Sequence, residues 1–211
     1  MTDRLETKAP KLDARWDEAI ASWEQGNKFK ALALYKALAD EGEAYALVEI
    51  GNLHELGAID GTPNFEEAAK WYRKAIFSVD DPKAHLGMAR MLFNRQLQVS
   101  HDGESFSRHA LAAAARGETL AKLFLGLAYE GGCFGTIDKE KAAAYYEQAA
   151  LEGMILAERR LVRLALDSGR YWVATKLFLT SCFRSIRIAF RNPSDPRLAG
   201  VSPRTYSKRE T

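Results

Sequence analysis

Apolar residues recur every three or four positions through most of the chain, which is the spacing of one face of an α-helix. The segments that show this spacing come in pairs. One set begins with alanines at positions 46, 84, 121 and 157, so the pattern returns after 38, 37 and 36 residues. A second set begins at positions 31, 68, 106, 142 and 174. The sequence therefore predicts an all-α fold in which helical hairpins repeat along the chain.

Residues that start helices follow the same period. Asn and Asp side chains accept hydrogen bonds from the free amides of a first helical turn. They stand four positions before the second set of segments, as Asn27, Asn64, Asp102 and Asp138. We expect these residues to be the N-caps of the second helix in each hairpin.

Residues that end helices also keep the period. Glycine closes a helix in the left-handed conformation without steric cost, and it stands at Gly42, Gly117 and Gly153. The unit between the first two has Val79 instead, but Asp81-Pro82 follows and predicts the start of a new helix there. Starts, stops and apolar positions agree on one repeat, although they are physically independent signals.

The pattern resembles the Sel-one-like repeat, which is similar to the tetratricopeptide repeat but has a longer loop between its helices A and B. One unit carries the resemblance in Ala46, Gly51, Gly57, Asn64 and the run Ala-Ala-Lys-Trp-Tyr-Arg-Lys-Ala over 68–75. Another carries it in Ala121, Gly126, Asp138 and the run over 142–150. The resemblance implies an α-α superhelix, a right-handed solenoid with a concave face made mainly by the A helices. It also implies an adaptor that binds other proteins.

The expected organisation is one solenoid over 13–191, preceded by a flexible N-terminus over 1–12 and followed by a flexible basic tail over 192–211. The expected repeat units cover about 13–42, 43–79, 81–117, 118–153 and 154–191. Short turns are expected at Gly26-Asn27 in the first unit and at Asp167-Ser168-Gly169 in the last.

Composition and charge narrow the class of protein. Apolar residues make up 47% and charged residues 27%, as in an ordinary soluble domain, and the net charge is +2. From Arg184 to the end, seven basic residues face two acidic ones, so the preceding part is slightly acidic. That balance argues against RNA binding by helical repeats. Neither a signal peptide nor a cysteine framework is apparent, which favours the cytoplasm, with the membrane periphery as a further possibility.

The partner-binding candidates are A-helix residues that are not needed for packing between helices. If the family's geometry holds, they face the groove and contact a protein or peptide partner, although for any single residue a solvated surface is the simpler interpretation. The candidates are Tyr45, Asn52, Glu55, Lys83, Arg90, Asn94, Lys122, Glu130, Arg159 and Arg163.

The segment 171–191 is the most apolar of the chain and ends in basic residues. The simpler interpretation, which we favour, is a last helix that caps the solenoid, although a cap has a polar outer face and this segment is apolar on most sides. The other is docking on a second copy, on another protein or on an anionic membrane. The docking candidates are Phe183, Arg184, Arg187, Phe190 and Arg191. A peripheral membrane adaptor is therefore the alternative to a groove-binding scaffold.

Nothing in the sequence predicts catalysis, a cofactor or a metal site. The four histidines have no ligand spacing with a nearby acid, and packing is the simpler role for them. The glycines at 131–135 lack a following Lys-Ser/Thr and follow a helix, so they predict a loop between helices instead of a phosphate site. We therefore expect a scaffold without enzymatic activity.

Overall fold

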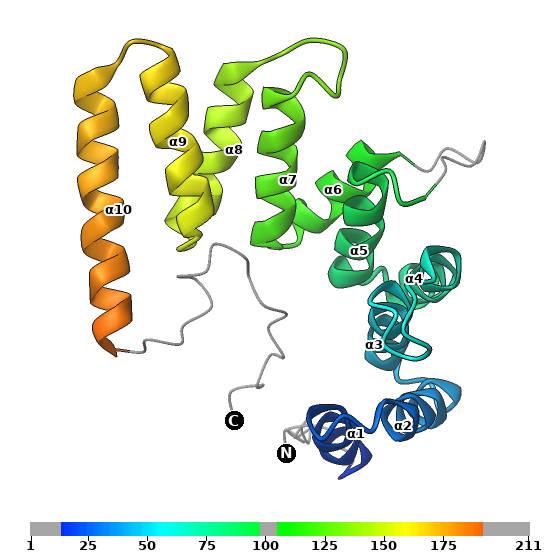
Figure 1. Cartoon of the computed structure of the whole chain (residues 1–211). Helices are drawn as coiled ribbons and strands as arrows, with labels where there is room; N and C mark the ends of the chain where they lie inside the picture. Colours follow the sequence, from blue (N-terminus) through cyan, green and yellow to red (C-terminus); the bar gives the residue numbers. More distant parts are fainter. Residues whose placement is uncertain (1–13, 98–104, 192–211) are drawn as a thin grey trace, which may run out of the picture. The chain divides into compact units, whose positions relative to one another are not determined.

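A computed structural model describes residues 14–97 and 105–191, and every regular element in these ranges is an α-helix (Figure 1). The helices are α1 Ala14–Glu24, α2 Lys28–Asp40, α3 Ala44–Glu55, α4 Phe65–Val79, α5 Pro82–Phe93, α6 Phe106–Ala115, α7 Thr119–Glu130, α8 Lys139–Leu151, α9 Ile155–Asp167 and α10 Tyr171–Arg191. The all-α prediction is confirmed. The expected N-terminal segment 1–12 and the tail 192–211 lie outside the described residues.

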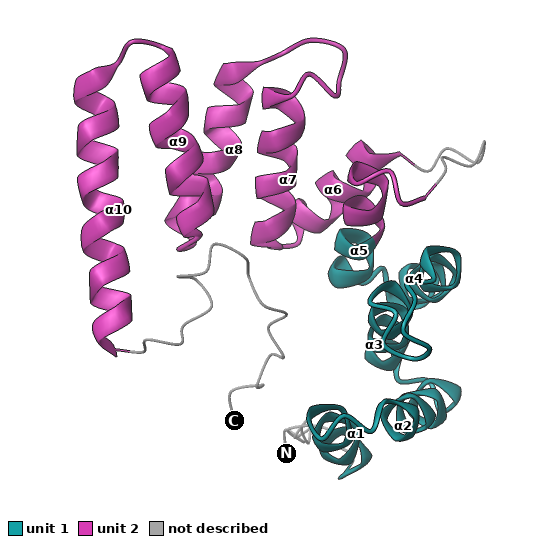
Figure 2. Cartoon of the chain, in the orientation of Figure 1, with its two compact units in different colours: residues 1–87 teal, residues 88–211 magenta. Residues whose placement is uncertain are grey.

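The chain divides into two compact units, residues 1–87 and 88–211 (Figure 2). In unit 1, α1 packs on α2, α2 on α3, and α3 on α4. In unit 2, α6 packs on α7, α7 on α8, α8 on α9, and α9 on α10. The division falls within α5, and the repeat spacing does not predict it.

Helix starts follow the expected N-caps in three of four cases. Asn64 Oδ1 accepts a hydrogen bond from the Glu67 amide at 3.0 Å, and Asp138 Oδ1 accepts one from the Lys141 amide at 2.9 Å. Asn27 caps α2 in the same way. Asp102 itself lies outside the described residues, but the expectation that it caps this helix is wrong, because Ser105 caps the helix that begins at Phe106. The cap therefore stands three residues later than the repeat spacing predicts, and Ser105 Oγ accepts a hydrogen bond from the Arg108 amide.

Helix ends also follow the predicted glycines. Gly42, Gly117 and Gly153 all have φ between +91° and +96°, directly after the last helical turn. In the unit that lacks glycine, Asp80 takes the left-handed conformation with φ +53°. Its carboxylate lies 2.7 Å from Nε2 of the buried His85, and Asp81 then caps the start of α5 at Pro82. Short polar residues tolerate this backbone conformation better than branched ones.

A buried tyrosine packs on an A-helix glycine in each unit. Tyr72 of α4 lies against Gly51 of α3 and Gly87 of α5, where an added Cβ would be 2.7 Å and 2.6 Å from the ring. Tyr146 of α8 lies against Gly126 of α7, where a Cβ would be 2.4 Å from the ring. Only glycine allows the helices to approach this closely, so the small and large positions of the repeat are matched.

The two ends of the described chain differ in how they are covered. In unit 1, Trp16 and Trp23 of α1 pack on the cluster that contains Tyr35 and Ile50. In unit 2, α10 follows the predicted turn at Asp167-Ser168-Gly169 and covers α9 with Ala174, Leu177 and Ser181. At 21 residues, α10 is the longest described helix, and its other side carries exposed aromatic residues.

Candidate functional site

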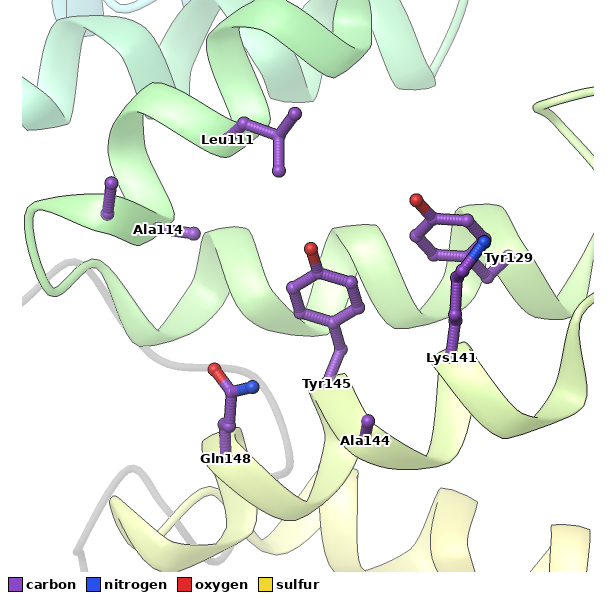
Figure 3. A pocket seen from close by; sticks show the side chains of 8 residues that line it. Leu111, Ala114, Tyr129, Lys141, Ala144, Tyr145 and Gln148 are labelled. Carbon is purple, nitrogen blue, oxygen red and sulfur yellow. The ribbon is translucent and has the colours of Figure 1, made fainter.

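An open groove in unit 2 lies where α6, α7 and α8 meet. Its volume is about 520 Å³. Leu111 projects from α6, while Tyr145, Lys141 and Gln148 project from α8 into the same space (Figure 3). The remaining lining residues are Tyr129 of α7 and three small ones, Ala114, Ala115 and Ala144. We call this set of residues the tyrosine groove.

Aromatic stacking fixes the groove's walls. The rings of Tyr129 and Tyr145 are stacked, with centroids 5.7 Å apart and planes 9° apart. Phe134, in the long loop between α7 and α8, packs against Tyr129 at 4.6 Å and against Phe106 at 6.0 Å. The long loop is therefore held to the helices that form the groove, and contacts of this kind orient rings as well as bury them.

One cation and two phenols are the ionisable groups of the groove's lining. Lys141 Nζ lies 5.3 Å from the Tyr129 ring centroid and 3.2 Å from Asp138 Oδ2. The hydrogen bond to Asp138 raises the pKa of Lys141, so its ammonium stays charged at neutral pH. Burial raises the pKa of the Tyr145 hydroxyl, which therefore stays protonated. The lining contains no carboxylate, imidazole or thiol group.

In unit 1, two of the expected groove residues serve the fold. The Tyr72 hydroxyl lies 2.8 Å from Asn52 Oδ1 and 2.7 Å from Glu55 Oε2, and donates its proton to one of them at a time. Tyr45 is about half exposed, and Lys83 lies in the first turn of α5, where its amide donates to Asp81. A role of these residues in partner binding stays a prediction.

In unit 2, the residues predicted to bind a partner lie in different environments. Lys122 forms an ion pair with Glu152, and Glu130 accepts the Tyr146 hydroxyl at 2.5 Å with Arg160 Nη1 at 3.7 Å. Arg90 is half-buried and Asn94 is exposed near the end of α5, whereas Arg159 and Arg163 are exposed on α9. The candidates do not line the tyrosine groove, and their role in binding a partner stays a prediction.

The docking candidates of the C-terminal helix divide into two groups. Phe183, Arg187, Phe190 and Arg191 are exposed on α10. Arg184 instead points inward, pairs with the buried Glu158 and donates to the Ala150 carbonyl at 3.0 Å. Arg184 therefore anchors α10 to the preceding hairpin.

Sequence reasoning missed the tyrosine groove because it used the run over 142–150, which contains Tyr145 and Tyr146, only as a repeat signature. Only Tyr146 is fully buried, and Tyr145 faces the groove. Adjacent residues on a helix point about 100° apart, so a helix that is covered on one side cannot bury both. The 100° step between neighbouring helical residues was therefore the signal that could have identified Tyr145 as a groove residue.

The described residues contain no group of three or more His, Cys, Asp or Glu side chains that could hold a metal ion. Cys133 is exposed and Cys182 half-buried, and both are free thiols. Within 14–97 and 105–191, no helix combines the length and the apolar character needed to cross a bilayer.

Comparisons with known proteins agree with the repeat pattern. The family model for the Sel1 repeat, called Sel-one-like above, matches residues 44–76 and 119–154. Chitin synthase regulatory factor 3 of Schizosaccharomyces pombe is 29% identical over 136 residues, which are 64% of this chain. The matched region spans only 14% of that protein.

Solved structures show a similar fold at low sequence identity. A Sel1 repeat protein from Oxalobacter formigenes has a TM-score of 0.63 at 20% identity, over 92% of this chain and 87% of its own. The protective antigen c5321 of uropathogenic Escherichia coli, which displays an SLR fold, has a TM-score of 0.63 at 20% identity over 82% of this chain and 38% of its own.

The immunity protein Pa5087 from Pseudomonas aeruginosa has a TM-score of 0.55 at 23% identity, over 94% of this chain and 78% of its own. At these identities the likeness concerns the fold alone. The two segments that match the Sel1 repeat model lie one in each of the chain's two compact units, and the solved structures share the chain's fold.

Proposed function

We propose that this protein is a non-enzymatic scaffold that binds a segment of a partner protein in the tyrosine groove. Sel1 repeats generally serve as scaffolds for protein–protein interactions, which supports the class of function. The observation that carries the location is the groove itself, whose lining combines the stacked Tyr129 and Tyr145, the exposed Leu111 and three alanines. Tyrosines are enriched among the residues that dominate binding energy at interfaces.

The shape of the groove favours a protein segment as its occupant. Pockets for small molecules have a similar volume but enclose most of the ligand, whereas this groove is open along one side. Ala114, Ala115 and Ala144 allow a partner backbone to approach, and the Gln148 amide can both donate to it and accept from it. The partner segment would insert a large apolar side chain between Leu111 and Tyr145.

The test compares proteins captured by the intact chain with those captured by a groove variant. Leu111→Gln places a polar group where the partner's apolar side chain would lie. Leu56→Gln is a matched control, because Leu56 is 47% exposed against 48% for Leu111 and lies in unit 1. Melting temperatures check that both variants fold.

We expect at least one protein to be captured equally by the intact chain and by Leu56→Gln. The captured amount of that protein should fall roughly tenfold or more with Leu111→Gln, because a polar group at an interface hot spot weakens binding by at least this factor. Tyr145→Ala should lose the same protein. If every captured protein is retained equally by Leu111→Gln and Tyr145→Ala, the groove is not the binding site.

A further inference from the structure

The helix α10 exposes an apolar face opposite the side that packs on α9. Ala174 and Ser181 are buried against the preceding hairpin, and Leu177 packs on its core. The exposed face begins with Trp172, which is 83% exposed, resumes two turns later at Leu179, and continues from there at intervals of three or four residues through Phe183, Ile186 and Phe190. The last helix of a repeat array normally has a polar outer face. An exposed apolar face on α10 therefore indicates an interaction surface.

Cations border the apolar face on one edge. The sequence of α10 contains no acidic residue. With about 3.6 residues per turn, Lys176 and Arg187 fall beside Phe183 on one edge of the face, and Arg191 follows one turn later. All three are exposed. The sequence after α10 adds four basic residues against two acidic ones.

Cations also border the other edge, on α9. A depression of about 350 Å³ lies between the two helices, where Arg159 and Val162 meet Phe178, Cys182 and Ile186. Arg163 is exposed one turn further along α9. Of the two acidic residues of α9, Glu158 is buried against Arg184 and Asp167 stands at the end of the helix. The apolar face therefore lies between two cationic edges.

We propose that this face of α10 docks on an anionic lipid membrane surface, with the helix lying in the plane of the membrane. Aromatic residues on one face and Lys or Arg along its borders are the pattern of interfacial helices. Each basic residue near an anionic surface strengthens binding about fivefold. A second copy of the chain fits less well, because pairing two α10 helices would bring together two acid-free, cationic surfaces. This interaction is separate from the partner binding proposed for the tyrosine groove.

The test is flotation of the full chain with lipid vesicles. Neutral phosphatidylcholine vesicles are compared with vesicles containing about one third phosphatidylglycerol. We expect binding to the anionic vesicles to exceed binding to neutral ones by roughly tenfold or more, and to fall steeply with added salt. Trp172 supplies a second readout, since its emission should shift to the blue on anionic vesicles and the shift should vanish in Trp172→Phe.

Two pairs of variants test the face itself. Phe183→Ser/Phe190→Ser should abolish flotation, whereas Phe77→Ser should not, because Phe77 is 94% exposed but lies on α4 in unit 1. Lys176→Gln/Arg187→Gln should weaken binding to anionic vesicles roughly tenfold or more. Its charge-matched control, Lys36→Gln/Lys139→Gln, removes two exposed lysines from other helices and should change little.

Several results would overturn the proposal. One is failure of the intact chain to float with anionic vesicles, and another is equal flotation with neutral ones. A third is a lipid-free dimer in sedimentation that Phe183→Ser/Phe190→Ser converts to monomer while neither form binds vesicles, which would make a second copy the occupant. Leu111→Gln should bind vesicles normally, so failure here can be told apart from failure of the groove proposal.

Discussion

At the scale of single residues, the repeat depends on a matched pair formed by a glycine and a tyrosine. Tyr146 lies on Gly126 and Tyr72 on Gly51, and each hydroxyl reaches an acidic residue at the end of the A helix, Glu130 or Glu55. In the sequence, Gly51 and Gly126 were recognisable as shared positions of the two most similar repeat units. The sequence did not predict the hydroxyl partners, because Asn52, Glu55 and Glu130 look like exposed helix positions when only their spacing is known.

Gly126→Ala should destabilise unit 2 by about 1–3 kcal/mol, the usual cost of an overpacked core. The added Cβ would lie 2.4 Å from the Tyr146 ring, so the ring or α8 must move. Urea denaturation measures the loss. In a Tyr146→Leu background the same substitution should cost much less, and an equal cost in both backgrounds would show that the ring is not the cause.

Tyr146 also predicts a pH dependence in alkaline solution. Burial and the hydrogen bond to Glu130 raise its pKa above the ordinary value of 10.0. The stabilisation is fully present below pH 10 and is lost above it, because the unfolded chain releases the proton while the folded chain retains it. The free energy of unfolding should therefore fall above pH 10, and it should fall less steeply in Tyr146→Phe. Equal slopes for the two proteins would contradict this role.

At the scale of elements, helix boundaries were largely predictable because caps and glycines act locally. Asn64, Asp138 and Gly153 each satisfy or close the backbone within one turn, so neighbouring sequence suffices. Ser105 caps α6 in place of the expected Asp102, because Ser and Asp are both capping residues and the repeat period alone does not choose between them. The inward course of Arg184 depends on Glu158, which lies 26 residues earlier, and spacing carries no information about such a contact.

Arg184→Met should weaken the attachment of α10. It leaves Glu158 buried without its cation and removes the hydrogen bond to the Ala150 carbonyl. We expect a loss of about 1–3 kcal/mol in chemical denaturation, the cost of leaving a buried partner unsatisfied, since Arg184 itself is partly exposed. Glu158→Gln/Arg184→Met should recover part of that loss, and a double variant as unstable as the sum of both single variants would argue against the pair.

At the scale of the whole molecule, the repeat period predicted the all-α class but neither the two compact units nor the groove. The period reports how each helix pair resembles the others. The tyrosine groove depends on how they differ, because Leu111 stands on α6, outside the two segments that match the Sel1 repeat model. Binding sites on repeat proteins use such variable positions, whereas the repeated positions hold the stack together.

Site-specific photo-crosslinking is the most direct test of the central claim that the tyrosine groove holds a partner protein. A photoreactive phenylalanine analogue is placed either at Ala144, which lines the groove, or at the exposed Phe77 of unit 1. The account predicts that the captured partner crosslinks from position 144 and not from position 77. A partner that binds both proteins but crosslinks only from position 77, or equally from both, would contradict it.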